Sequence, residues 1–236
     1  MTNQLAQNLT GNVKSEEDIQ RQIEQAILDH RLPPGSKLKE VQLGEIFGVK
    51  RGTIRKVLTR LANSHLVVQT PNRGASVAKP SAEEGRDLFA TRRTLEGAIV
   101  ETLATKSNDT LVRQLRNLLE KEHIAYQQGD SKRALALSVD FHRQLAAMAG
   151  NSVMQEFLSD IIRRTPLVIL SHVGSDSENR CRNHEHEAIV DAIAKGDAKK
   201  AVKIMNTHLL HIENQISDEP DPEQPDLATL LLSEQT

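Results

Sequence analysis

The sequence predicts a mainly α-helical protein built from two parts of opposite charge. Apolar residues recur at helical spacing along most of the 236-residue chain, and aromatic residues, which favour strands, make up only 2% of it. The first 80 residues carry 12 Lys and Arg against 7 Asp and Glu, whereas residues 81–236 carry 18 against 25. A basic first third followed by an acidic remainder indicates two domains with different partners.

Composition and breaks in the helical pattern place the domain boundaries. Residues 1–14 are polar and are expected to be disordered. Residues 15–80 should form the basic domain, and residues 81–217 an all-helical domain. Residues 218–236 begin with an acidic, proline-rich stretch that is typical of a flexible tail.

The basic domain is predicted to contain three helices followed by a β-hairpin. Ser15 and the acids after it are typical of a helix N-terminus, because acidic side chains favour the positive end of a helix. That helix should stop at Pro33-Pro34-Gly35, and Gly48 should end a second, shorter helix. The second and third helices are expected over 40–47 and 50–62, and two strands over 67–69 and 75–77, joined by a turn over 71–74.

Residues 81–217 predict helices only. Ser81 opens a second acidic N-terminal segment, and each later break carries a Gly, Asn or Asp that stops or caps a helix. Because the connections are short, the helices should run antiparallel in a bundle. The six expected helices cover 82–105, 109–128, 131–149, 151–170, 178–195 and 197–216.

The third predicted helix has a basic face and an apolar one. Between Lys50 and Arg60 the chain has five basic residues and no acidic one. The apolar residues of this helix recur at helical spacing: Ile54, Val57, Leu58 and Leu61. Such a helix, behind a tight turn and ahead of a hairpin, is typical of a winged helix-turn-helix, whose recognition helix lies in the major groove of DNA. Its basic side chains should be free to meet phosphates and base edges; a solvated basic face is the alternative.

This part of the chain resembles the DNA-binding domain of the GntR family of bacterial transcription regulators. The resemblance rests on PPGSKLKEVQLGEIFGVKRGTIRKVLTRLANSHLV, followed by NRGASV. It implies that Arg51, Thr53 and Arg55 contact DNA and that Gly74 lies in the wing. Lys50 stands where the family usually has a capping Ser or Thr, so a cap worth about 1 kcal/mol is lost and a phosphate contact is gained. The predicted DNA-binding residues are Lys50, Arg51, Gly52, Thr53, Arg55, Lys56, Arg73 and Gly74.

Three histidines of the second domain should point into the bundle core. His142, His186 and His208 lie on the apolar faces of three different predicted helices, whereas His123 and His184 do not obviously do so. One inward histidine is usually a hydrogen-bonded core residue. Three imidazoles that converge inside a bundle would instead form a site for Zn²⁺, Ni²⁺ or a similar divalent ion.

The second domain, over about 82–216, resembles the FCD effector domain of the FadR-like GntR subgroup. The resemblance rests on Leu95-Glu96, on the segment 140–151 and on the spacing between His186 and His208. It implies a divalent metal held by one Asp and three His. In the family the Asp precedes the first His by four residues, but Ser138 takes that position here and Asp140 lies on another helix face. Either water or effector completes a three-histidine site, or metal binding is weak or lost.

Arg92 is the other candidate in this domain. Its helix neighbours are apolar, so it should face inward, and a buried arginine needs a partner. Glu96, four residues later, is the structural partner; an effector carboxylate held bidentately is the functional one. The family resemblance implies the second. The predicted effector site is Arg92, His142, His186 and His208.

Cysteine use and the N-terminus indicate the compartment. Cys181 is the only cysteine, so no internal disulfide is possible and a reducing compartment is favoured. The N-terminus lacks a basic stretch followed by an apolar one, and no apolar run is long enough to span a bilayer. We therefore expect a cytoplasmic protein without a membrane segment.

These features predict a sequence-specific transcription regulator, a repressor, and not an enzyme. By the resemblance, it should bind palindromic double-stranded DNA as a homodimer. An organic acid or related metabolite at Arg92 and the three histidines would lower operator affinity by population shift. One alternative is a metal-dependent hydrolase, although His-Glu-x-x-His, Gly-x-Ser-x-Gly and P-loop motifs are missing. The other is an architectural DNA-binding protein without an effector.

Overall fold

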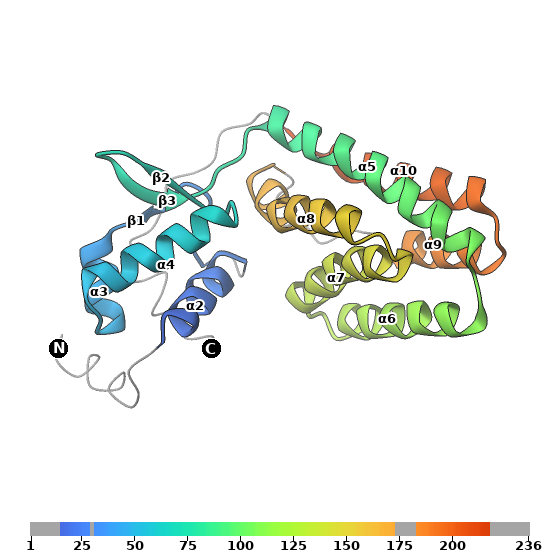
Figure 1. Cartoon of the computed structure of the whole chain (residues 1–236), viewed down its shortest axis with the longest axis horizontal. Helices are drawn as coiled ribbons and strands as arrows, with labels where there is room; N and C mark the ends of the chain where they lie inside the picture. Colours follow the sequence, from blue (N-terminus) through green and yellow to red (C-terminus); the bar gives the residue numbers. More distant parts are fainter. Residues whose placement is uncertain (1–14, 29–30, 173–182, 218–236) are drawn as a thin grey trace. The chain divides into compact units, whose positions relative to one another are not determined.

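The computed structural model describes residues 15–28, 31–172 and 183–217. The chain forms two compact units that divide between Pro80 and Ser81 (Figure 1). The segments predicted to be disordered, 1–14 and 218–236, lie outside the described residues, as does Cys181. Within the described part, no helix is both long and apolar enough to cross a membrane. The mainly helical fold class predicted from the sequence is confirmed.

Three helices form the core of the first unit: α2 (Glu16–Leu28), α3 (Glu40–Phe47) and α4 (Arg51–Asn63). The hydroxyl of Ser15 accepts a hydrogen bond from the backbone N–H of Asp18 at 3.1 Å, so the predicted N-terminal box of α2 is confirmed. The buried residues of α4 are the four of the predicted stripe, and α2 presents a matching apolar face. These two faces pack against each other and orient the opposite face of α4 outward.

A tight turn separates α3 from α4. Gly48 ends α3 with a positive φ of 66°, a conformation that costs glycine little because it has no Cβ. Lys50 precedes α4 in an extended conformation and makes no side-chain cap hydrogen bond, as its residue type predicts. The short α3–α4 connection leaves the outward face of α4 uncovered by the turn.

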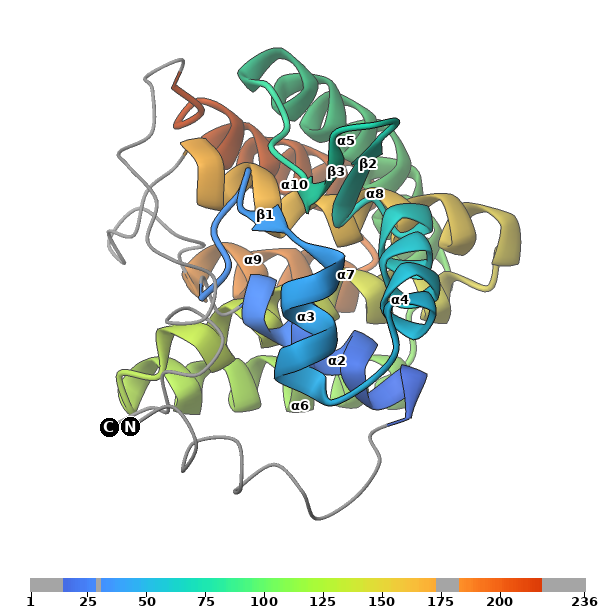
Figure 2. The same cartoon turned by 90° about the vertical axis from the view of Figure 1, so that its left-hand side faces the viewer.

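The wing is a three-stranded antiparallel sheet. Strands β2 (Val67–Thr70) and β3 (Gly74–Val77) form the predicted hairpin, with Thr70 opposite Gly74. A further strand, β1 (Lys37–Leu38), pairs with β3 and gives the order β1-β3-β2 (Figure 2). The sequence did not predict β1, because two residues are too short to show the alternation that marks a strand.

The second unit consists, in its described part, of the six expected helices: α5 (Ala82–Thr105), α6 (Asp109–Gln127), α7 (Ser131–Ala149), α8 (Ser152–His172), α9 (Asn183–Ala194) and α10 (Ala198–Glu213). Helix α9 is described only from Asn183, since 178–182 fall outside the described residues. The long helices α5 and α10 lie side by side and run antiparallel, with Gly85 near Ile216 and Gly97 near Asn206 (Figure 1). Apolar side chains from all six helices form one continuous core.

Gly85 permits the close approach of α5 to α8. A Cβ at this position would lie 2.7 Å from Cγ1 of Val168 and 3.3 Å from Cδ1 of Ile216. Gly97, on the same helix, differs, because a Cβ there would lie 3.7 Å from its nearest neighbours on α10.

We predict that Gly85→Ala destabilises the protein and Gly97→Ala does not. Alanine is favoured over glycine inside a helix by about 1 kcal/mol, but overpacking a rigid core typically costs roughly 1–3 kcal/mol. Denaturant unfolding of the two variants provides the measurement. A Gly85→Ala protein as stable as Gly97→Ala would show that α5 and α8 do not pack as closely as described.

Candidate functional site

The outward face of α4 carries the predicted DNA-binding residues. Thr53 is half-buried, and the other residues predicted on or beside this helix are exposed: Lys50, Arg51, Gly52, Arg55 and Lys56. Arg73 and Gly74 are exposed at the tip of the wing. Apart from the half-buried Thr53, the whole predicted set is therefore exposed at the surface of the first unit.

The arginines at the start of α4 are exposed, and both also contact an acidic side chain of the same unit. Glu40, the first residue of α3, accepts hydrogen bonds from Nε of Arg51 and from both Nε and Nη2 of Arg55, the last two at 3.1 and 3.2 Å. These bonds, first from Arg55 and then from Arg51, hold the pKa of Glu40 below its usual range. Glu40 lies at the start of α3, and the rest of α3 and the tight turn separate it from α4. The helical periodicity of α4 therefore cannot reveal Glu40 as the partner of Arg51 and Arg55.

The next two basic residues of α4 are also paired. Lys56 Nζ lies 3.2 Å from a carboxylate oxygen of Glu16, and Arg60 lies 2.9 Å from Glu16 and 3.1 Å from Glu17. All these groups are at least partly exposed, and exposed ion pairs contribute only about 0–1 kcal/mol. DNA phosphates can therefore replace Glu16 and Glu17 as partners at small cost.

In the second unit, the three predicted histidines converge. His142 on α7, His186 on α9 and His208 on α10 are each at most 2% exposed. The Nε2 atom of His208 lies 3.3 Å from Nε2 of His186 and 3.4 Å from Nε2 of His142. Their ligand atoms all lie within 4.8 Å of one another. The expectation that these side chains point inward is confirmed, whereas His184 is exposed and His123 is half-buried.

Each histidine of this cluster is held by a carboxylate at its other ring nitrogen. Nδ1 of His142 bonds to Glu96, on α5. Nδ1 of His186 lies 2.9 Å from Glu122, on α6, and Nδ1 of His208 lies 2.8 Å from Glu185, on α9. A neutral imidazole that donates its Nδ1 proton presents a lone pair at Nε2. The three carboxylates thus turn three lone pairs toward one point.

Arg92 is buried, as expected, but its partner is Glu96. Its Nε donates to Glu96 at 2.6 Å, and both side chains are almost fully buried. Burial raises the pKa of Glu96, but the charge of Arg92 and the contact with His142 outweigh it and lower that pKa to about 2. Glu96 therefore stays ionised and links Arg92 to the histidine cluster. An effector carboxylate is not needed to compensate Arg92, so its role in effector binding stays a prediction.

The donor set fits a divalent metal ion. Zn–N bonds of 2.0–2.1 Å in a tetrahedron place two nitrogens about 3.3 Å apart, and the two shorter Nε2 separations are 3.3 and 3.4 Å. Carboxylates behind metal-binding histidines are a common outer shell, because they orient the ring and increase its basicity. Ser138 is buried at the position of the family's Asp, and Asp140 does not join the cluster of ligand atoms in the described chain. The described residues thus offer three imidazoles and no carboxylate as ligands at this point.

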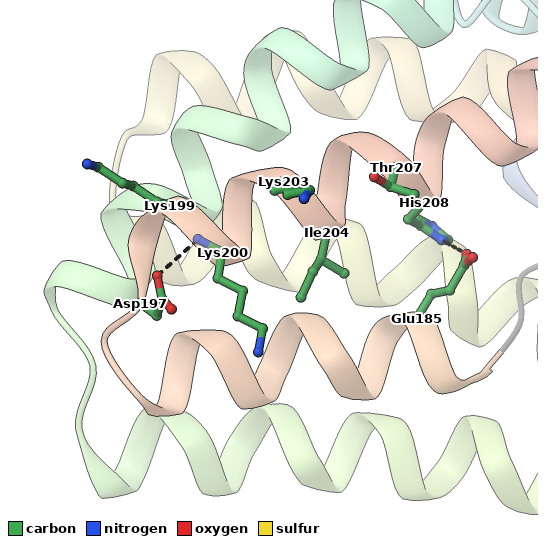
Figure 3. Close-up of a pocket in the computed structure, with 8 residues that line it drawn as sticks. All are labelled: Glu185, Asp197, Lys199, Lys200, Lys203, Ile204, Thr207 and His208. Carbon is green, nitrogen blue, oxygen red and sulfur yellow. Dashed lines mark hydrogen bonds and ion pairs between the residues drawn. The ribbon is translucent and has the colours of Figure 1, made fainter.

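A groove between α9 and α10 leads to this cluster (Figure 3). The cavity has a volume of about 590 Å³, and Glu185 and His208 lie at one end of it. The rest of the cavity is lined by Asp197, Lys199, Lys200, Lys203, Ile204 and Thr207. The three lysines outnumber the carboxylates of Glu185 and Asp197, and this excess of positive charge favours an anion.

Comparison with known proteins agrees with both units. Residues 15–77 match the gntR family of bacterial regulatory proteins, and residues 87–211 match the FCD domain. The chain belongs to the GntR family. It is therefore a DNA-binding transcription regulator with an FCD domain and not an enzyme, which removes the hydrolase alternative.

Similar GntR proteins include named repressors. The chain is 25% identical to the HTH-type transcriptional repressor RspR of Escherichia coli K12 over 203 residues, which cover 85% of this chain and 88% of RspR. It is 27% identical to the repressor NanR of Cronobacter sakazakii, with 83% of each chain covered. Among solved structures, a GntR protein from Rhodococcus sp. RHA1 has a TM-score of 0.75 at 24% identity, covering 85% of this chain and 96% of that one. The last comparison supports the fold alone.

The three carboxylates behind the histidines were not predicted as site residues. Glu96 was considered only as the partner of Arg92, and Glu122 and Glu185 were not singled out. Glu185 has a weak signal, since it directly precedes His186. Glu122 has none, because it lies 64 residues from the histidine that it contacts.

We predict that Zn²⁺ or Ni²⁺ stabilises the metal-free protein through these histidines. A ligand at 100 times its dissociation constant contributes about 2.7 kcal/mol to stability, which a thermal shift will detect. His208→Ala should abolish the shift, and Glu122→Gln should weaken metal affinity roughly 10- to 100-fold. His184→Ala, an exposed histidine on α9, is the matched control and should bind as wild type does. Equal shifts in His208→Ala and His184→Ala would argue against this site.

A second prediction separates base reading from phosphate contact on α4. Arg51→Ala should cost roughly 1–3 kcal/mol on a selected duplex and much less on a scrambled one. Lys56→Ala should weaken binding to both duplexes about equally. It should also reduce the slope of log affinity against log salt concentration by about one, because one phosphate contact is lost. Fluorescence anisotropy titrations at several salt concentrations measure both effects. An equal loss on the two duplexes for Arg51→Ala would indicate that this residue contacts phosphates only.

Proposed function

We propose that this protein is a repressor whose affinity for a palindromic operator is controlled by a small anionic metabolite bound in the FCD domain. The convergence of three histidine Nε2 atoms beside a lysine-lined groove is the observation that carries the proposal. Two copies of the chain would place two α4 helices in successive major grooves of the operator, which is the usual symmetry of helix-turn-helix regulators. The names of the relatives RspR and NanR favour repression over activation.

The three histidines would hold a divalent ion, and that ion would offer open coordination positions to oxygen atoms of the effector. The chain itself supplies orientation and charge. Glu122 and Glu185 hold the imidazoles, while Glu96 is balanced by Arg92. The ligands are neutral, so a bound dication would keep its positive charge toward the effector, which favours an organic acid.

The groove also favours an organic acid as the effector, and it lies on the Nδ1 side of His208, opposite the Nε2 atom that would bind the metal. Lys199, Lys200 and Lys203 are among the residues that line a cavity large enough for a small metabolite. Glu185, at one end of this cavity, lies 2.8 Å from Nδ1 of His208. Burial raises the pKa of Glu185, but hydrogen bonds from His208 and His211 outweigh it and lower that pKa. Among the described residues, Glu185 is the only acid that contacts both His208 and His211. An anion bound in the groove would disturb these contacts. Movement of α9 against α10 would then shift the population of DNA-binding-competent dimers.

The first experiment captures genomic fragments on the purified full-length protein and footprints the bound ones. We expect protection of a short inverted repeat near a promoter, because a symmetric dimer reads two half-sites. The neighbouring genes then suggest which organic acids to test for release of the DNA. Weak binding without sequence preference would support the architectural alternative instead.

The lysines of the groove allow a test of the effector class. Lys200→Glu/Lys203→Glu should raise the concentration of the releasing organic acid at least about tenfold, since each charge-assisted contact contributes roughly 1.5–3 kcal/mol. Lys121→Glu on α6 makes the same kind of change on an exposed surface away from the groove and serves as the control. Release from the operator by a panel of mono-, di- and tricarboxylic acids is the measurement. Unchanged release in the double variant would exclude the groove from effector binding.

A further inference from the structure

One carboxylate holds both arginines at the start of the recognition helix. Glu40 accepts from Nε of Arg51 and from Nε and Nη2 of Arg55. The side chain of Glu40 is 20% exposed, whereas those of Arg51 and Arg55 are 63% and 61% exposed. The carboxylate therefore lies at the base of the pair, and the two guanidinium groups extend past it toward solvent.

The contacts with Glu40 leave the outer edges of both guanidinium groups available. Arg51 uses only Nε, so neither of its Nη groups takes part. Arg55 uses Nε and Nη2, so Nη1 takes no part. Bidentate recognition of a guanine needs two N–H donors from one arginine, and each of these side chains keeps at least two. Binding to Glu40 and reading of a base are thus compatible.

We propose that Glu40 is a positioning residue that sets DNA sequence specificity by holding Arg51 and Arg55 side by side in one orientation. An arginine ordered before binding loses less side-chain freedom when it meets a base edge. The negative charge of Glu40 also opposes attraction to phosphates, which is the sequence-independent part of DNA affinity. The ordering of the two arginines widens the gap in affinity between selected and unrelated DNA, whereas the charge of Glu40 lowers the affinity for both by a similar factor.

Other acids of the first unit differ from Glu40 in ways that supply controls. Glu16, on α2, contacts Lys56 and Arg60 further along α4 and not the two arginines at its start. Glu45 lies on α3 with Glu40 and is exposed, with no ion pair among the described residues. Replacing Glu45 by Gln removes the same charge from the same helix without touching an arginine.

The experiment measures discrimination by the full-length chain. Wild type first selects duplexes from a random library, and affinities are then compared between the most enriched duplex and a scrambled one of equal composition. We expect Glu40→Gln to lower the ratio of the two affinities at least tenfold, with weaker binding to the enriched duplex and equal or tighter binding to the scrambled one. Glu45→Gln and Glu16→Gln should keep the ratio within about twofold.

A second set of variants tests whether Glu40 acts through the arginines. Adding Glu40→Gln to Arg51→Ala/Arg55→Ala should change the affinity ratio no further, because the groups that it positions are gone. Thermal unfolding of each variant shows that the domain is still folded. A Glu40→Gln protein whose affinities for both duplexes shift by the same factor would overturn the positioning role. The inference rests on the proposed sequence-specific binding of DNA. A wild type that enriches no sequence would overturn both that proposal and the role of Glu40. Equal enrichment by wild type and Glu40→Gln would overturn only the role of Glu40.

Discussion

Both candidate sites, the histidine cluster and the start of α4, depend on contacts between a carboxylate on one helix and a histidine or arginine on a neighbouring helix. In the helical unit, Glu96, Glu122 and Glu185 each fix the Nδ1 side of one histidine, so that three Nε2 atoms face one another. Because these acids lie on three different helices, the cluster exists only when the bundle is packed. Any change in the packing of α5, α6 or α9 therefore alters the direction of at least one lone pair.

Burial decides how firmly each set of contacts is held. The histidine cluster and its acids Glu96 and Glu122 are almost completely buried, where an unpaired charge is expensive, so each group must have its partner. Arg92 supplies that balance for Glu96. Oε1 of Glu122, by contrast, is buried without a hydrogen-bond partner among the described residues, so one polar atom of the network is left unsatisfied.

On the recognition helix the same kind of contact is exposed and correspondingly weak. Exposed ion pairs contribute little to stability, so exchanging Glu16 or Glu17 for a DNA phosphate costs the protein little. Glu40 differs because it meets two arginines at once and because its side chain is only 20% exposed. One unit thus contains exchangeable pairs suited to reversible attraction and one shared carboxylate suited to fixing geometry.

The helices, their caps and the faces that they bury could be predicted from the sequence, because these depend on residue types within a few positions of one another. The stripe of α4, the box at Ser15 and the inward direction of the three histidines all follow from local periodicity. Only the tertiary structure decided which groups meet across helices: the pairing of Glu40 with Arg55, the contact of Glu122 with His186 and the addition of β1 to the wing. Periodicity tells which side of a helix is buried, but the partner on the next helix depends on how separate elements pack in three dimensions.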